Sequence, residues 1–60
     1  MIVVWNDGEV DNYFTGKINN TGYVWSSKKE DAQSYYGADD LGSVIEDLLC
    51  ENFEPLKVFK

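Results

Sequence analysis

The short run IVVW, residues 2–5, decides the fold of this 60-residue chain. Successive side chains of a strand point to opposite faces, so a run of consecutive apolar residues makes both faces apolar. Strands of this kind are typical of the middle of a sheet, where both faces are covered. Residues 2–5 therefore predict a central strand, which needs a neighbouring strand on each edge.

The residues after this run predict a second strand. The pair Asp7-Gly8 is typical of a tight two-residue hairpin, and the strand that follows is expected over residues 10–18. Gly16 within this strand indicates a bulge or the close approach of another backbone, because glycine otherwise weakens a strand interior.

Two more strands are expected, one near the middle of the chain and one at its end. The sequence NNTG, residues 19–22, predicts a turn, and YVWS, residues 23–26, predicts a short strand after it. Beyond Pro55, which cannot continue a helix, residues 56–59 alternate in character and predict a final strand. This final strand is expected beside residues 2–5, because the central strand needs a second neighbour.

Residues 27–30, with the sequence SKKE, fit the capping box that starts many helices. In this motif a serine at the N-cap and a glutamate three positions later each satisfy a free backbone N–H. Ala32, Tyr35 and Tyr36 would then share one face of a short helix. Gly37 is expected to end this helix as a left-handed C-cap.

A second, longer helix is expected after an N-cap at Asp39 or Asp40. Its apolar residues recur with the period of a helix that buries one face: Leu41, Val44, Ile45, Leu48 and Leu49. The predicted fold class is α+β, in a single domain over residues 1–60. A small antiparallel sheet, with the element order β-β-β-α-α-β, carries both helices packed on one face.

The charge of the chain limits the classes of partner. The chain has 11 acidic residues, five lysines and a net charge of −6. Such a chain is repelled by phosphates, which argues against direct nucleic-acid binding and against binding to anionic membranes. No apolar run is long enough to span a bilayer. Cys50 is the only cysteine, which excludes an internal disulfide and predicts a reducing, cytoplasmic location.

No residue pattern indicates catalysis. The chain has no histidine, and Cys50 lies between Glu46 and Glu51, whose negative charges disfavour a thiolate. Carboxylate pairs can transfer protons, but a chain this short is expected to have no deep pocket in which to shift their pKa values. We therefore expect no enzyme activity and no cofactor.

One acidic pattern has a spacing that metal ligands also use. Asp7, Glu9 and Asp11 occupy alternate positions, which resembles a calcium loop only loosely, because that loop needs more ligands and a different glycine position. A hairpin turn accounts for the same residues. With one cysteine and no histidine, a structural zinc site is disfavoured as well, and no metal is expected.

Four aromatic residues are candidates for self-association: Trp5, Tyr13, Tyr23 and Trp25. If both helices cover one face of the sheet, some of these rings lie bare on the other face, which is unusual for a monomer. Tyrosine and tryptophan are also enriched among the residues that dominate protein interfaces. The alternative is that the rings fill the core beneath the helices, where several are needed. We expect a homodimer formed through the aromatic face.

Four acidic residues are candidates for binding a partner: Asp39, Asp40, Glu46 and Asp47. They belong to a stretch from Glu30 to Glu51 that contains no lysine. One alternative is that they are cap residues and the solvated side of the helices. Another is that they imitate the phosphates of DNA and occupy the groove of a nucleic-acid-binding enzyme.

Two segments carry a resemblance to a known group of proteins. NYFTGK, residues 12–17, and VWSSKKEDAQSYYGADDLGSVIEDL, residues 24–48, resemble small uncharacterised accessory proteins of bacteriophages and prophages, chiefly from Gram-positive bacteria. The resemblance implies a phage-encoded protein in the bacterial host cytosol. It also implies binding and inhibition of a host enzyme or of a bacterial anti-phage defence protein.

The sequence thus predicts a small acidic protein that is not an enzyme and acts by binding another protein. The expected partner is a host or defence protein, and the chain itself is expected to form a homodimer. Two alternatives stay open. The first is an acidic mimic that blocks a DNA-binding enzyme, and the second is a structural or regulatory phage component with no inhibitory role.

Overall fold

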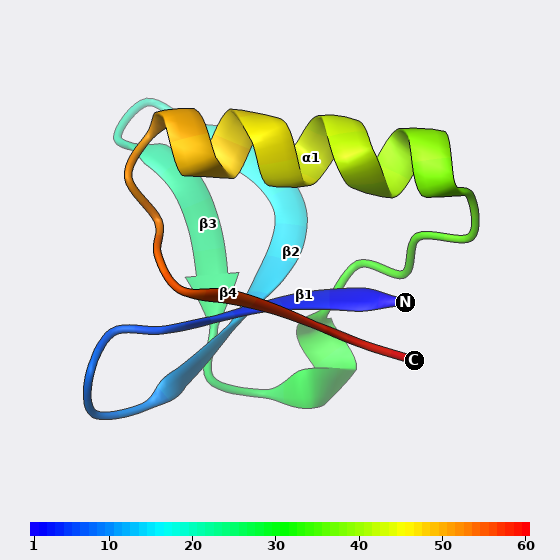
Figure 1. The fold of residues 1–60 in the computed structure, drawn as a ribbon. Helices are drawn as coiled ribbons and strands as arrows, with labels where there is room; N and C mark the ends of the chain where they lie inside the picture. The colour runs from blue at the N-terminus through cyan, green and yellow to red at the C-terminus, as the bar shows by residue number, and fades with distance from the viewer.

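The computed structural model describes all 60 residues and has an α+β fold. Four strands form one antiparallel sheet in the order β3-β2-β1-β4 (Figure 1). A 3-10 turn and a single α-helix lie between β3 and β4 along the chain. The bounds of the elements are β1 Ile2–Asn6, β2 Asp11–Asn19, β3 Gly22–Ser26, η1 Lys29–Asp31, α1 Ala38–Cys50 and β4 Leu56–Phe59.

Strand β1 is central, as the sequence predicts. Val3 and Val4 are only 0% and 1% exposed, although their side chains point to opposite faces. On one edge Val4 pairs with Tyr13 of β2, and on the other Val3 pairs with Val58 of β4. The final strand therefore lies beside the first, which confirms the expected pairing.

The two faces of the sheet are covered by different elements. Helix α1 lies on one side of the sheet and η1 on the opposite side (Figure 1). Beneath α1, Val3 and Phe14 pack with Leu48 to form the core. On the other face, Lys29 of η1 lies near Ile2. The prediction of two helices on one face is therefore wrong, and so is the element order β-β-β-α-α-β.

Residues 27–37 do not form the expected helix. Only the turn η1 is helical, its N-cap is Lys28, and no side chain caps it. The serine that organises the turn is Ser26 rather than Ser27. Its Oγ accepts a hydrogen bond from the Lys28 N–H at 3.1 Å and donates one to Asp31 at 2.7 Å. The capping-box motif therefore identifies a turn but misplaces the serine that stabilises it.

The extended residues after η1 find hydrogen-bond partners in the sheet, which explains why the helix is absent. The Gln33 N–H donates to the carbonyl of Phe14 at 2.9 Å. Tyr35 exchanges two hydrogen bonds with Met1, of 2.7 and 2.8 Å. The pairing of β1 with β2 extends only as far as Val4 and Tyr13. Residues 33–35 therefore satisfy backbone groups that these two strands leave unpaired.

Glycine at position 37 begins a helix instead of ending one. Gly37 has φ −112° and is the N-cap of α1, and its carbonyl accepts a hydrogen bond from the Leu41 N–H at 3.0 Å. The expected left-handed C-cap is therefore wrong. Asp39 and Asp40, expected as N-cap residues, lie in the first turn of α1, where the helix dipole favours negative charge.

The C-terminal end of α1 is a Schellman motif, which turns the chain back towards the sheet. The Phe53 N–H donates to the carbonyl of Leu48 at 3.1 Å, and the Asn52 N–H donates to that of Leu49 at 3.0 Å. Asn52 adopts the left-handed φ of 67° that this motif requires. Phe53 then packs against the core cluster that contains Leu48, so the helix end is anchored by an apolar contact.

Gly16 bends β2 at a bulge, as the sequence predicts. The register of β2 with β3 shifts between Phe14 and Ile18, and Gly16 has φ +79°. A Cβ atom at Gly16 would lie 3.0 Å from the Cβ and Cγ atoms of Gln33. The bulge and the close approach of residues 33–35 are therefore parts of one arrangement.

The connection between β1 and β2 is a loop over residues 7–10, not the expected two-residue hairpin, since Asn6 pairs with Asp11. One carboxylate oxygen of Asp7 accepts hydrogen bonds from the N–H groups of Glu9 and Val10 at 3.0 and 3.1 Å. These N–H groups hold the pKa of Asp7 below its ordinary value. The carboxylate of Asp7 therefore has a structural role in this loop.

We expect Gly16→Ala to lower the free energy of unfolding by about 2 kcal/mol, because alanine is strained at positive φ and its Cβ meets Gln33. Urea denaturation followed by circular dichroism measures this change. Gly42→Ala is the matched control: it lies in α1 with no atom within 4 Å of a new Cβ, and we expect it to stabilise by up to about 1 kcal/mol. Equal effects of the two variants would contradict the bulge.

Asn52→Gly and Asn52→Ala are expected to change stability in opposite directions. Glycine removes the strain of the left-handed conformation, whereas alanine increases it, so the two variants should differ by about 1 kcal/mol or more. Thermal unfolding measures the change, and the unfolding temperature should be highest for Asn52→Gly, lower for the unmodified chain with Asn52, and lowest for Asn52→Ala. Asn20→Ala, in a loop without positive φ at that position, is expected to be nearly neutral. A loss of stability in Asn52→Gly would contradict the Schellman motif.

Candidate interaction surface

An aromatic cluster lies beneath the C-terminal end of α1. The ring centroids of Trp5 and Trp25 are 5.5 Å apart, and those rings lie 4.9 and 5.1 Å from Phe53. Tyr23 meets Phe53 edge-on at 5.8 Å. Such tilted and edge-to-face pairs stabilise by about 0.5–1.5 kcal/mol each beyond the area they bury. The cluster supplements a core of only five buried residues.

The four aromatic residues expected to mediate self-association do not share a face. Trp5, Tyr23 and Trp25 contribute to this cluster under α1. Tyr13 pairs with Val4, one position away from Trp5, and therefore points to the opposite face. Of the four, Tyr13 alone lies on the face opposite α1, half-buried near Phe59, so the four rings do not form one aromatic face. Self-association itself stays a prediction.

A groove with an aromatic floor runs along β3. It is lined by Ile18, Thr21, Gly22, Tyr23, Trp25, Glu51 and Phe53. Its floor is formed by rings of the cluster, and Figure 1 shows the C-terminal end of α1 above β3. Ile18 is 70% exposed at the side of the groove and extends its apolar surface.

The electrostatic environment of the groove is negative. Removal from water raises the pKa of the Tyr23 phenol, and Asp47 and Glu51 raise it further, because a phenolate would be repelled by their carboxylates. Glu51 also lines the groove directly. The acidic end of α1 and the aromatic groove are thus contiguous.

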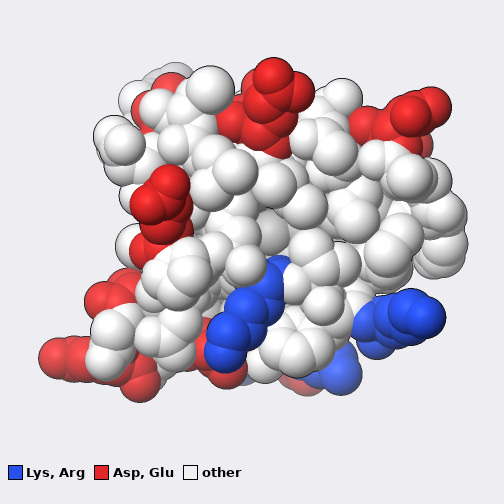
Figure 2. Space-filling view, viewed as in Figure 1, with Lys and Arg blue, Asp and Glu red and all other residues white.

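The four acidic residues expected to bind a partner are all exposed on α1. Asp39 and Glu46 are seven positions apart, as are Asp40 and Asp47, and this spacing places each pair in one row along the helix. Figure 2 shows acidic side chains over α1 and over the loop between β1 and β2. The structure therefore brings the expected acidic residues together on one helix, with Asp47 towards the groove.

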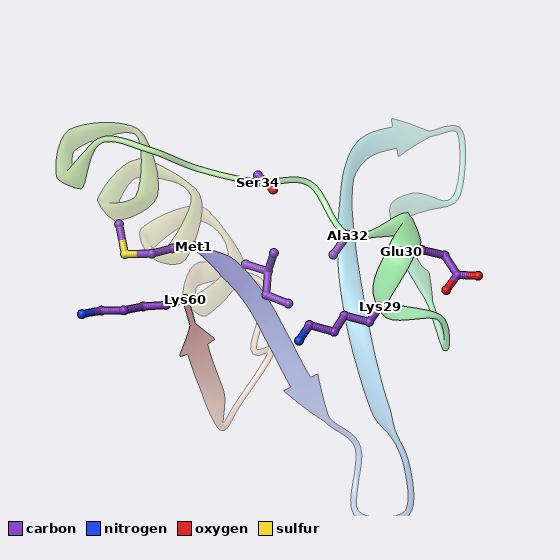
Figure 3. A pocket seen from close by; sticks show the side chains of 7 residues that line it. Met1, Lys29, Glu30, Ala32, Ser34 and Lys60 are labelled. Atoms are coloured by element: carbon purple, nitrogen blue, oxygen red, sulfur yellow. The ribbon is translucent and has the colours of Figure 1, made fainter.

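Lysines gather elsewhere on the molecule. Figure 2 shows them below α1, on the side where β4 and η1 lie. A shallow depression there is lined by Met1, Lys29, Glu30, Ala32, Ser34 and Lys60. Figure 3 shows Lys60 beside Met1, Lys29 across the start of β1, and Glu30 turned away. The depression is open to solvent, so its ammonium groups stay hydrated and bind an anion only weakly.

The remaining reactive groups do not converge on a site. Cys50 is exposed, and no group of three or more His, Cys, Asp or Glu residues is arranged to hold a metal ion. The indole N–H of Trp25 is buried without a hydrogen-bond partner, whereas that of Trp5 donates to the carbonyl of Glu54 at 3.2 Å. None of the helices has the length and hydrophobicity that crossing a membrane requires.

Comparisons with protein-family models, with curated proteins and with solved structures found no match to this chain. The interaction surface is therefore defined by the geometry of this molecule: the acidic rows of α1 and the aromatic groove beside β3.

Five of the seven residues that line the groove were not among the candidates that the sequence indicated: Ile18, Thr21, Gly22, Glu51 and Phe53. Phe53 follows the helix in the sequence, and its position depends on the left-handed Asn52. Ile18 reaches the groove because of the bulge at Gly16. Gly16 allowed the bulge to be predicted from the sequence. It did not indicate which side chains the bulge would bring together.

We expect the double variant Asp47→Asn, Glu51→Gln to lower the pKa of Tyr23 towards its ordinary value without restoring it fully, because burial contributes most of the increase. A pH titration of the tyrosine ring carbons by NMR measures the change. Tyr35, whose pKa is raised by burial alone, is the internal control and should not respond. An unchanged Tyr23 pKa would place the two carboxylates away from the groove.

Proposed function

We propose that this chain is a non-catalytic protein-binding module whose contact surface combines the acidic rows of α1 with the aromatic groove beside β3. The observation that carries the proposal is the contiguity of these two features. Glu51 lines the groove, and Asp47 acts on the phenol of Tyr23. A partner that fits this surface presents basic side chains next to an apolar segment.

Each half of this surface supplies what the other lacks. Exposed charges steer association and set specificity, but they add little affinity on their own because water and salt screen them. Aromatic residues in partly desolvated grooves provide most of the binding energy in many interfaces. A partner that is both basic and apolar therefore associates faster and binds more tightly here. A partner that makes only ionic contacts associates faster but binds no more tightly.

The comparison of charge densities favours a protein partner over imitation of DNA. Helix α1 has 13 residues and is therefore about 20 Å long, with Asp39, Asp40, Glu46 and Asp47 along it. Duplex DNA of that length carries about 12 phosphates. An acidic density near one third of the duplex value is a poor substitute for it, and the aromatic groove has no role in such imitation.

The resemblance to phage accessory proteins supplies the finer proposal. On this reading the partner is a host or bacterial anti-phage defence protein, and binding inhibits it. The surface described above is compatible with this role, since an inhibitor of this size needs only to cover a functional region of a larger protein. The resemblance alone carries the phage origin and the inhibition.

Neutralising the acidic rows is expected to weaken capture of the partner by about tenfold or more, because several charge-assisted contacts are lost together. The variant carries Asp39→Asn, Asp40→Asn, Glu46→Gln and Asp47→Asn. The measurement is tagged capture from bacterial lysate that contains defence complexes, at low and at high salt. Proteins retained by the unmodified chain are identified and their affinities measured after purification.

A matched variant removes the same number of charges elsewhere: Glu9→Gln, Asp11→Asn, Glu30→Gln and Glu54→Gln. We expect it to retain the partner, and thermal unfolding of both variants checks that each is folded. Equal losses in the two variants would show that net charge alone matters and would contradict the proposed surface. Capture only of DNA-binding proteins, and only at low salt, would support the acidic mimic instead.

A further inference from the structure

We propose that the free edge of β3 accepts an extended segment of the partner as a fifth strand of the sheet, and that this segment places apolar and basic side chains over the aromatic groove. The inference rests on the proposed function and specifies the chemistry of the partner. It is carried by three features of the same region: the unpaired strand edge, the aromatic groove and the local negative charge.

The first feature is the unpaired edge. Strand β3 has β2 as its only neighbour. The carbonyl of Val24 accepts a hydrogen bond from the Thr15 hydroxyl at 2.9 Å and therefore faces β2. The backbone N–H and C=O groups of successive residues point to opposite edges of a strand. Those of Tyr23 and Trp25, on either side of Val24, therefore face away from β2. No backbone hydrogen bond outside the helices and strands involves either residue.

The second feature is the position of the groove relative to this edge. The side chains of Tyr23 and Trp25 line the groove, so the residues with outward backbone groups also form its floor. Ile18 stands beside them, 70% exposed. An added strand that bonds to the outward groups has alternate side chains directly over this apolar floor. The main chain thus supplies affinity and the groove supplies selectivity.

The third feature is the charge. Glu51 lines the groove, and Asp47 lies near enough to act on Tyr23. Side chains of the added strand that flank its apolar residue on the α1 side meet these carboxylates. Lysine or arginine at those positions gains attraction, and aspartate or glutamate is repelled. The occupant is therefore a basic, alternating segment.

A second copy of this chain is a poorer occupant. Two copies that paired through β3 would bring Glu51 and Asp47 of both chains to one interface, and the strand itself, GYVWS, offers no basic residue to oppose them. Each chain also carries a net charge of −6, so long-range repulsion opposes the encounter. The same local charge that attracts a basic segment disfavours self-pairing at this edge.

The test is an NMR titration of the isotopically labelled chain with a synthetic peptide of sequence TKTVTKT, about the length of one strand. Its lysines and valine share one face when it is extended. We expect the largest amide shifts, and slowed hydrogen exchange, at Tyr23 and Trp25. N-methylation of the peptide amides that face β3 should weaken binding by about tenfold, because at least two hydrogen bonds are lost.

Two variants of the chain separate the groove from general charge. Ile18→Lys places a positive charge in the groove and should weaken peptide binding by about tenfold. Val10→Lys adds the same charge at another exposed position, in the loop before β2, and should leave binding nearly unchanged. Both residues are mostly exposed, so both variants are expected to fold, and circular dichroism checks this.

Several outcomes would overturn the inference. Shifts confined to α1 that survive N-methylation would show ionic binding without strand addition, as would equal effects of Ile18→Lys and Val10→Lys. Absence of saturable binding up to millimolar peptide would reject the edge as an acceptor of basic strands. Protection of Tyr23 and Trp25 in the chain alone, with a dimer in sedimentation analysis, would identify a second copy as the occupant.

The outcomes also distinguish this inference from the function on which it rests. If a captured partner depends on the acidic rows of α1 but is insensitive to Ile18→Lys, the protein-binding function stands and the strand addition falls. If neither the acidic rows nor Ile18 affects any partner, both fall together.

Discussion

The burial of Val3 and Val4 on opposite faces of β1 is the constraint on which the rest of the structure depends. Both side chains are removed almost completely from water, and burial of a valine contributes about 1.5–3 kcal/mol. For a chain of this size such contributions are a large part of the total stability. Each face of the sheet must therefore be packed against another segment of the chain. A chain of 60 residues has few residues left to do this.

The two faces of the sheet are packed against segments of different size. Helix α1 protects one face with the row that contains Leu41, Val44, Ile45 and Leu48, while Leu49 remains partly exposed. The other face receives only η1, and the extended residues 33–35 pair with Met1 and Phe14. An α-helix at residues 27–36 could not make those hydrogen bonds. The demand of β1 for partners thus outweighs the local preference for a helix.

Features that depend on a pattern within a few neighbouring residues were mostly predicted correctly, whereas features that depend on contacts distant in the sequence were not. The central strand, the bulge at Gly16 and the apolar row of α1 follow from patterns within a few residues, and all are present. The capping box at Ser27 is equally local but fails, because the pairing of residues 33–35 with residues far away in the sequence overrides it. The acidic residues of α1 were predicted from one helix. The groove combines β2, β3 and the residues after α1, so no single stretch could reveal it.

The position of β4 has a consequence for the order of folding. β1 pairs with β2 across a short loop, but its pairs with β4 join residues as distant in the sequence as Ile2 and Phe59. Contacts this distant in sequence form slowly. Until β4 pairs with it, one edge of the apolar strand IVVW has no partner. An unpaired strand edge can pair with strands of other chains, which leads to aggregation. Because the pairs within β1, β2 and β3 are closer in sequence, the edge of β1 that faces β4 is the last edge of this central strand to be paired.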